Sequence, residues 1–192
     1  MRIAIKNFYH PWTFTFQQHK CATQGTIIAV IQFGTLKKQT SHIMIEWKCK
    51  HFTELSADEL YTILRLRSEV FVVEQNCVFL DADNKDQQCY HLCGWLENEL
   101  VAYVRLVPPG LSFSEPSIGR VATSPAHRKS GFGRLLMEHA IKDCLKIFGK
   151  QNIKIGAQLY LKEFYESLMF RQCSKVYLED EIEHIEMLYV CE

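Results

Sequence analysis

The sequence contains no long hydrophobic run and no excess of charge of either sign. Its longest uninterrupted apolar run is five residues, as in residues 27–31, whereas a membrane-spanning helix needs about 20. Lysine and arginine together number 22, and so do aspartate and glutamate. These absences predict no membrane partner and no nucleic-acid partner. With 47% hydrophobic and 23% charged residues, the 192-residue chain is expected to fold as one domain, or as one domain with an appendage.

Acidic side chains are missing from the first 43 residues. That segment shows little periodicity, and its single arginine does not suit a mitochondrial presequence. From Ile45 to Lys50, in contrast, apolar and charged residues alternate as in a half-buried strand. We therefore predict a domain at 44–192, preceded by an extension at 1–43 that is poorly ordered or peripheral. Met44 is the expected natural start.

The eight cysteines include no C-x-x-C pair, and no secretory signal opens the chain. These features indicate reduced thiols and a cytoplasmic location. Cys89, His91 and Cys93 are spaced by two, which would place them on one face of a strand. Because no further ligands accompany them, we expect a half-buried strand face and no metal site.

The apolar pattern predicts a mixed α/β fold with helices on both faces of the sheet. A capping box at Ser56–Glu59 opens a helix that should end near Glu74. The loop at 76–88 has aspartates spaced like those of a calcium site, but it lacks the mid-loop glycine and the final glutamate, so we expect a solvated loop. Further strands are predicted at 89–96, 100–107, 118–123, 153–157, 171–178 and 184–191, with helices after Gly133 and at 160–168.

The segment Arg128-x-x-Gly131-x-Gly133 lies between a predicted strand and a predicted helix. Glycines let a backbone approach a ligand closely, and the free amides of a helix N-terminus bind phosphate oxygens. Lys129 adds positive charge at the same end. The segment is neither a P-loop nor a full dinucleotide fingerprint, since Leu136 replaces the third glycine. By itself it is equally compatible with a helix N-terminus that has convenient glycines.

This loop resembles the acetyl-CoA motif of the GNAT acetyltransferases. Phe164–Phe170 resembles the second motif of that family, and departs from it at Met169, where glycine is usual. Other segments resemble the bacterial ElaA-type acetyltransferases in particular: residues 66–77, 91–95, 103–106, 118–121, 156–158 and 176–187. Glu181 and Glu183 depart from that subfamily, which usually has glycine and proline there. The resemblance runs from Met44 to near the C-terminus.

The resemblance implies a GNAT-type mixed, mostly antiparallel sheet in which strands 118–123 and 153–157 splay apart into an acetyl-CoA slot. It implies acetyl-CoA as cosubstrate and a backbone N–H near Val121 as the oxyanion donor. The residues it places against acetyl-CoA are Val121, Ala122, Thr123, Arg128, Lys129, Ser130, Gly131, Phe132, Gly133 and Arg134.

Tyr165 is the general acid that the resemblance implies, although an aromatic residue there can also serve core packing alone. Glu74 is a candidate for binding or deprotonating the amine, or a solvated helix end. The candidates for the acceptor pocket are His91, Arg105, Arg120 and His184. The alternative for both histidines is a structural role. The alternative for both arginines is internal pairing with Glu74 or with an aspartate of 81–86, because buried arginines need partners.

The sequence thus predicts a cytoplasmic N-acetyltransferase that moves an acetyl group to a primary amine of a small molecule or peptide. Two alternatives stay open: a degenerate CoA-binding regulatory or interaction module, and an acyltransferase like the acyl-homoserine-lactone synthases. The oligomeric state stays open between monomer and homodimer.

Overall fold

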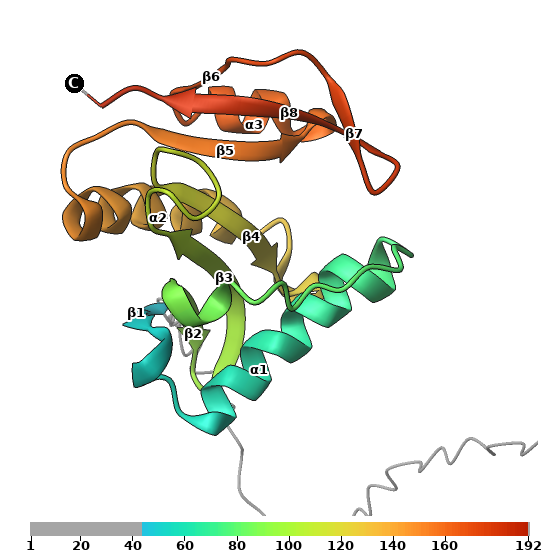
Figure 1. The fold of residues 1–192 in the computed structure, drawn as a ribbon. Helices are drawn as coiled ribbons and strands as arrows, with labels where there is room; N and C mark the ends of the chain where they lie inside the picture. The colour runs from blue at the N-terminus through green and yellow to red at the C-terminus, as the bar shows by residue number, and fades with distance from the viewer. Residues whose placement is uncertain (1–43, 192) are drawn as a thin grey trace, which may run out of the picture. The chain divides into compact units, whose positions relative to one another are not determined.

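The computed structural model describes residues 44–191 (Figure 1). The extension predicted at 1–43 lies outside the described residues, so its order and the domain boundary stay predictions.

An eight-stranded sheet forms the centre of the described domain, in the order β1-β2-β3-β4-β5-β8-β6, with β7 also paired to β8. The strands are β1 (Glu46–His51), β2 (Tyr90–Leu96), β3 (Glu99–Val107), β4 (Ser117–Thr123), β5 (Ile153–Gln158), β6 (Phe170–Gln172), β7 (Tyr177–Glu179) and β8 (Ile182–Tyr189). Neighbouring strands are antiparallel except β4 and β5, which are parallel and share one register pair, Ser117 with Lys154. Beyond that pair the two strands diverge (Figure 1). The predicted fold class is therefore confirmed, including the splayed strands.

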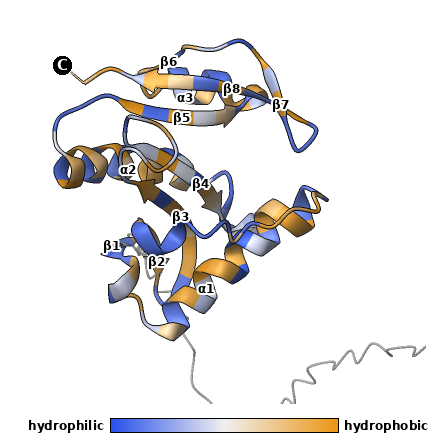
Figure 2. Ribbon diagram, viewed as in Figure 1, coloured by the Kyte–Doolittle hydropathy of each residue, from blue (hydrophilic) through white to orange (hydrophobic). Residues whose placement is uncertain are grey.

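Helices cover both faces of the sheet. They are α1 (Ala57–Arg67), which continues as a π-helix (Ser68–Glu74), α2 (Phe132–Phe148) and α3 (Lys162–Glu166). On one face, α1 packs Ile63 and Leu66 against Tyr103 of β3. On the other, α2 and α3 enclose the larger core, which holds Leu136 and Tyr165. Hydrophobic residues are plentiful along β3 and α1, whereas the tip between β7 and β8 is hydrophilic (Figure 2).

The predicted capping box starts α1. The Glu59 amide donates to Ser56 Oγ at 3.2 Å, and the Ser56 amide donates to Glu59 Oε2 at 2.9 Å. The helical segment ends at Glu74, as predicted, but its last seven residues are wound as a π-helix. Such segments are rare and often occur at functional sites.

The single closing strand predicted at 171–178 is wrong. The chain forms two short strands, β6 and β7, which pair with different parts of β8. Residues 173–176 separate them, and there the Cys173 amide donates to the Glu186 carbonyl. Asp180 and Glu181 make the two-residue turn into β8 with φ of +49° and +65°. Glu181 thus adopts a left-handed conformation, which explains why glycine is usual at this position in the subfamily.

Two features of residues 44–191 concern membranes and metals. None of the helices there has the length and hydropathy needed to cross a bilayer. The same residues contain no group of three or more side chains placed to hold a metal ion.

Candidate active site

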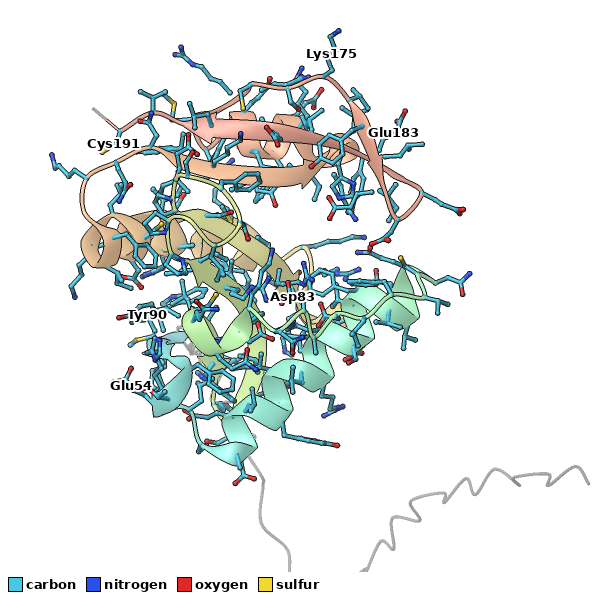
Figure 3. The ribbon with its side chains drawn as sticks, viewed as in Figure 1. Glu54, Asp83, Tyr90, Lys175, Glu183 and Cys191 are labelled. Carbon is cyan, nitrogen blue, oxygen red and sulfur yellow. The ribbon has the colours of Figure 1, made fainter. Side chains whose placement is uncertain are left out.

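A cavity of about 850 Å³ opens where β4 and β5 diverge. Its walls come from β4, from the ends of β5 and the π-helix, and from the β7–β8 hairpin. In Figure 3 the labelled Asp83, which lines the cavity, lies on the side of α1, and the labelled Glu183 identifies the β7–β8 hairpin on the other side. The separation of β4 and β5 thus produces a slot that is lined by strands on both sides of the gap.

The glycine loop forms a second cavity of about 300 Å³ at the N-terminus of α2. Gly131 caps the helix with φ of +80°, which favours glycine, and a Cβ built there would meet no atom within 4 Å. Its role is therefore conformational, and it leaves the helix amides open to an anion. Seven of the ten residues predicted to contact acetyl-CoA line this small cavity: Thr123, Arg128, Lys129, Gly131, Phe132, Gly133 and Arg134.

The other three predicted contacts differ in position. Val121 lines the large cavity, together with Thr123. Ser130 is exposed within the loop. The side chain of Ala122 is 2% exposed in the core beneath α1, so it lines neither cavity.

Two candidate residues are brought together that the sequence did not connect. Both terminal nitrogens of the Arg128 guanidinium, Nη1 and Nη2, donate to the Glu74 carboxylate, Nη2 at 2.6 Å from Oε2. The Arg128 hydrogen bond lowers the pKa of Glu74. Next to this pair, Gln158 Nε2 donates to Gln75 Oε1 at 3.2 Å. The end of the π-helix therefore contacts both the glycine loop and β5.

The predicted solvated loop at 76–88 is wrong for two of its aspartates. Asp81 and Asp86 are 7% and 6% exposed, because arginines from three elements surround them. Arg67 of α1 donates to both, and Arg105 of β3 donates to Asp86 Oδ1 at 2.7 Å. Burial alone would raise the Asp86 pKa, but the arginines lower it. Guanidinium groups thus supply the positive charge between these aspartates.

The two candidate pocket arginines are paired internally. Arg105 donates to Asp83 from Nη1 at 2.7 Å and from Nη2 at 2.8 Å. Arg120 Nε donates to Asp81 Oδ1 at 2.7 Å, and its guanidinium lies 5.7 Å from the Phe79 ring centre. Both arginines also line the large cavity. They are therefore paired internally, as one alternative predicted, and they lie at the pocket, as the other predicted.

His91 is not among the residues that line the large cavity. It is fully buried, and its Nε2 lies 3.1 Å from the carbonyl oxygen of Asp86. Since a carbonyl only accepts, Nε2 donates, and the Tyr103 hydroxyl then donates to Nδ1 at 2.8 Å. The structure thus gives His91 the position of a structural histidine, and burial lowers its pKa.

His184 does line the large cavity. Its Nδ1 lies 2.9 Å from the Ile182 carbonyl oxygen, so Nδ1 donates, and the ring stacks on Tyr177. In the neutral imidazole, Nε2 is then left as a proton acceptor.

Tyr165 lines the large cavity from α3 although it is only 6% exposed. Its ring packs edge-on against Phe164 and Phe170 at centroid distances of 5.1 and 6.0 Å. Burial raises the pKa of its phenol to about 12. Tyr165 therefore packs in the core and also lies on the wall of the cavity.

Comparison with known proteins identifies the family. Residues 64–191 match the family model described as "Acetyltransferase (GNAT) domain". The chain belongs to the GNAT acetyltransferases. It is 41% identical to the protein ElaA of Escherichia coli K12 over 146 residues, which are 75% of this chain and 95% of ElaA. UPF0039 protein sll0451 of Synechocystis is also 41% identical over 146 residues, covering 76% and 95% of the two chains.

Solved structures agree with this assignment. An acyl-CoA N-acyltransferase from Pseudomonas aeruginosa has a TM-score of 0.74 and 38% identity, and the match covers 77% of this chain and all of that one. The crystal structure of E. coli ElaA has a TM-score of 0.71 and 40% identity, with 76% and 99% covered. The GNAT and ElaA-type resemblance is thus confirmed, and this GNAT chain is an acyltransferase.

Sequence reasoning missed several cavity residues, among them Gln75, Phe79, Tyr160 and Tyr177. Gln75 and Tyr177 lie within segments that resemble the ElaA-type proteins, which was the available signal. Phe79 and Tyr160 had none, because their place in the cavity depends on how loops from both sheet halves pack together.

Proposed function

We propose that this GNAT acyltransferase moves an acetyl group directly from acetyl-CoA to a primary amine of a small molecule or peptide. The observation that carries the proposal is the pairing of an open slot between β4 and β5 with a glycine-bearing helix N-terminus beside it, since Thr123 and Arg128 line both cavities. A slot can hold an extended pantetheine arm, while the amides at Gly131–Arg134 suit a pyrophosphate.

In this proposal the amine nitrogen attacks the thioester carbonyl carbon, and the carbon–sulfur bond breaks as the amide forms. The main-chain N–H of Val121 stabilises the oxyanion of the tetrahedral intermediate. Tyr165 donates its proton to the departing thiolate. Its pKa of about 12 keeps the phenol protonated at neutral pH, which an acid requires.

The proton that leaves the amine needs an acceptor, and two cavity residues are candidates. Glu74 has a carboxylate, but Arg128 holds it and lowers its pKa, which makes it a weak base while the pair persists. His184 has Nδ1 committed to Ile182, which leaves Nε2 available. A cytoplasmic location is part of the proposal, and it is supported by six free thiols among the described residues: Cys49, Cys77, Cys89, Cys93, Cys144 and Cys173.

Release of free CoA thiol from acetyl-CoA, followed over a panel of amines, amino acids and peptides, tests the reaction. We expect amine-dependent release with acetylated amine as product. If CoA binds and no amine gives turnover, the chain is a CoA-binding module instead. If S-adenosylmethionine alone serves as acceptor, the synthase alternative is correct.

Cofactor placement has its own test, with two glycines at opposite ends of α2. Gly131 and Gly149 have φ of +80° and +88°, and both have open space around a built Cβ. Valine is strained at either position, but only residue 131 lies in the glycine loop. CoA at 100 times its dissociation constant should stabilise the parent and Gly149→Val by roughly 2.7 kcal/mol, and Gly131→Val much less. Equal CoA stabilisation of both variants would show that the loop is misassigned.

A further inference from the structure

Arg120 adopts an unusual backbone conformation in the middle of β4. Its φ is +57°, a left-handed value that a residue with a side chain rarely adopts. The register of β3 with β4 breaks here: Tyr103 pairs with Ala122, whereas Arg105 pairs with Gly119. Arg120 and Val121 form a β-bulge, and within the described strands neither has a register partner on β3 or β5. Such strain persists only where the surroundings enforce it.

Asp81, 39 residues away in sequence, makes the shortest contacts to the Arg120 side chain; Asp83 Oδ2 also accepts from Arg120 Nη2, at 3.5 Å. Asp81 Oδ1 accepts from Arg120 Nε at 2.7 Å, and the Asp81 carbonyl oxygen accepts from Arg120 Nη2 at 3.3 Å. Two contacts to one planar guanidinium fix its orientation as well as its distance.

Asp81 is itself held rigidly from its other side. Its Oδ2 accepts from Arg67 Nε at 2.7 Å, and the same carbonyl oxygen accepts from Arg67 Nη2 at 3.0 Å. Arg67 is fully buried at the point where α1 becomes the π-helix. A rigid connection thus runs from α1 through Asp81 to the bulge on the slot wall.

We propose that Asp81 is a positioning residue for acyl transfer: through Arg120 it fixes the bulge, and the bulge aims the Val121 N–H at the thioester carbonyl oxygen. This inference rests on the proposed function, in which Val121 is the oxyanion donor. It assigns a catalytic effect to a buried carboxylate that touches neither substrate.

A purely electrostatic role makes the opposite prediction for one of two variants. Asp81→Asn leaves the Arg120 charge unbalanced and makes the slot wall more positive, which favours an oxyanion. Arg120→Gly removes that positive charge, and glycine accepts the left-handed conformation without strain. Positioning predicts slower turnover in both variants, whereas electrostatics predicts faster turnover in Asp81→Asn and slower turnover in Arg120→Gly.

Asp86→Asn is the matched control. Asp86 is as deeply buried as Asp81 and also pairs with Arg67, but its second arginine is Arg105, and no hydrogen bond between Asp86 and Arg120 is formed in the described structure. If the cluster is disturbed, both aspartate variants should therefore lose stability. Only Asp81→Asn should also lose turnover.

The experiment measures kcat and the KM for acetyl-CoA with a chemistry-limited amine, at a temperature where every variant is folded. A misplaced catalytic group can cost roughly 100-fold, so we expect kcat to fall about 10- to 100-fold in Asp81→Asn and Arg120→Gly. KM should stay within about threefold, since the glycine loop is untouched, and Asp86→Asn should keep kcat within about threefold of the parent. Parental kcat in Arg120→Gly, or equal kcat in the two aspartate variants, would overturn the inference.

Two outcomes need a separate readout. If Asp81→Asn does not fold, a crystal structure of Arg120→Gly is needed beside its kcat, because both explanations predict slower turnover in that variant. A slower variant whose bulge has changed supports positioning, and a slower variant with an unchanged bulge overturns it. If the parent itself turns over no amine, the proposed function fails, and a crystal structure of Asp81→Asn then tests the positioning directly. We expect residue 120 to leave the left-handed region and β4 to change register. An unchanged bulge in that structure would also overturn the inference.

Discussion

Glu74 holds Arg128 by both of its carboxylate oxygens, across 54 residues of sequence. Arg128 is the first residue of the glycine loop, and Glu74 is the last residue of the π-helix. Both side chains are about 40% exposed. A cofactor pyrophosphate that pairs with Arg128 must therefore compete with the carboxylate that already occupies it.

We expect Glu74→Gln to bind CoA more tightly, because Gln has no charge with which to retain Arg128. Exposed ion pairs are worth about 0.2–1 kcal/mol, so the dissociation constant should fall by up to about fivefold. Titration calorimetry measures it, with Glu69→Gln as a control that removes an equal charge from the same π-helix. Weaker CoA binding in Glu74→Gln would mean that the pair prepares the loop for the cofactor. A lower kcat in Glu74→Gln, with parental kcat in Glu69→Gln, would identify Glu74 as the base.

Local signals made the capping box at Ser56 and the glycine loop at Gly131 predictable, since each feature is fixed by residues within one turn. The Asp81–Arg120 contact was not, although it was clear that buried arginines need partners. Which carboxylate pairs with which arginine depends on how the 76–88 loop folds onto the sheet. The left-handed Arg120 gave no sequence signal at all, because tertiary contacts impose it on a residue that does not favour it.

Met169 carries a removable strain. It follows α3 with φ of +71° and is 68% exposed, at the position where the family usually has glycine. A left-handed backbone costs a residue with a side chain about 1–2 kcal/mol, and glycine relieves this cost. Part of the gain in stability is lost again, because glycine loses more conformational entropy on folding. We expect Met169→Gly to raise the unfolding free energy by about 0.5–1 kcal/mol and Tm by about 1–4 °C. Met169→Ala keeps the strain, so a similar gain in that variant would contradict this explanation.

His91 should make the protein sensitive to mild acid. Burial lowers its pKa in the folded state, whereas the unfolded value is about 6.5. Below about pH 6.5 the unfolded chain therefore takes up a proton that the folded protein resists, and stability falls by at most about 1.4 kcal/mol per pH unit. The lowered pKa values of Asp83 and Asp86 add a second loss below about pH 4, where the unfolded aspartates protonate first.

Urea unfolding at pH 7.5, 6.5, 5 and 3.5 separates the two contributions, because only the lowest pH reaches the range where the aspartates protonate. His91→Gln should be less stable than the parent at pH 7.5, because it loses buried hydrogen bonds, but its stability should change less between pH 6.5 and 5. Identical pH dependence in the parent and His91→Gln would show that another group causes the acid sensitivity.

Tyr165→Phe should retain acetyl-CoA affinity and lose turnover. The departing thiolate is comparable to a cysteine thiol with a pKa of about 8.5, and burial keeps the Tyr165 pKa at about 12, so the phenol can donate across the whole working range. Proton donation of this kind contributes about 10²–10⁴-fold. Phenylalanine keeps the edge-on packing against Phe164 and Phe170, so stability should barely change, and the measurement is kcat with a chemistry-limited amine.

Tyr189→Phe is the control for the loss of a phenol. Tyr189 packs on the same Phe170 at 5.6 Å, but it is not among the residues that line the large cavity. Parental kcat in Tyr189→Phe together with a large loss in Tyr165→Phe would assign the acid to Tyr165. The parent rate should then also stay level on its alkaline side to about pH 10, since the acid that is required loses its proton only near pH 12. Parental kcat in Tyr165→Phe would leave its ring as packing and the thiolate to depart without an acid.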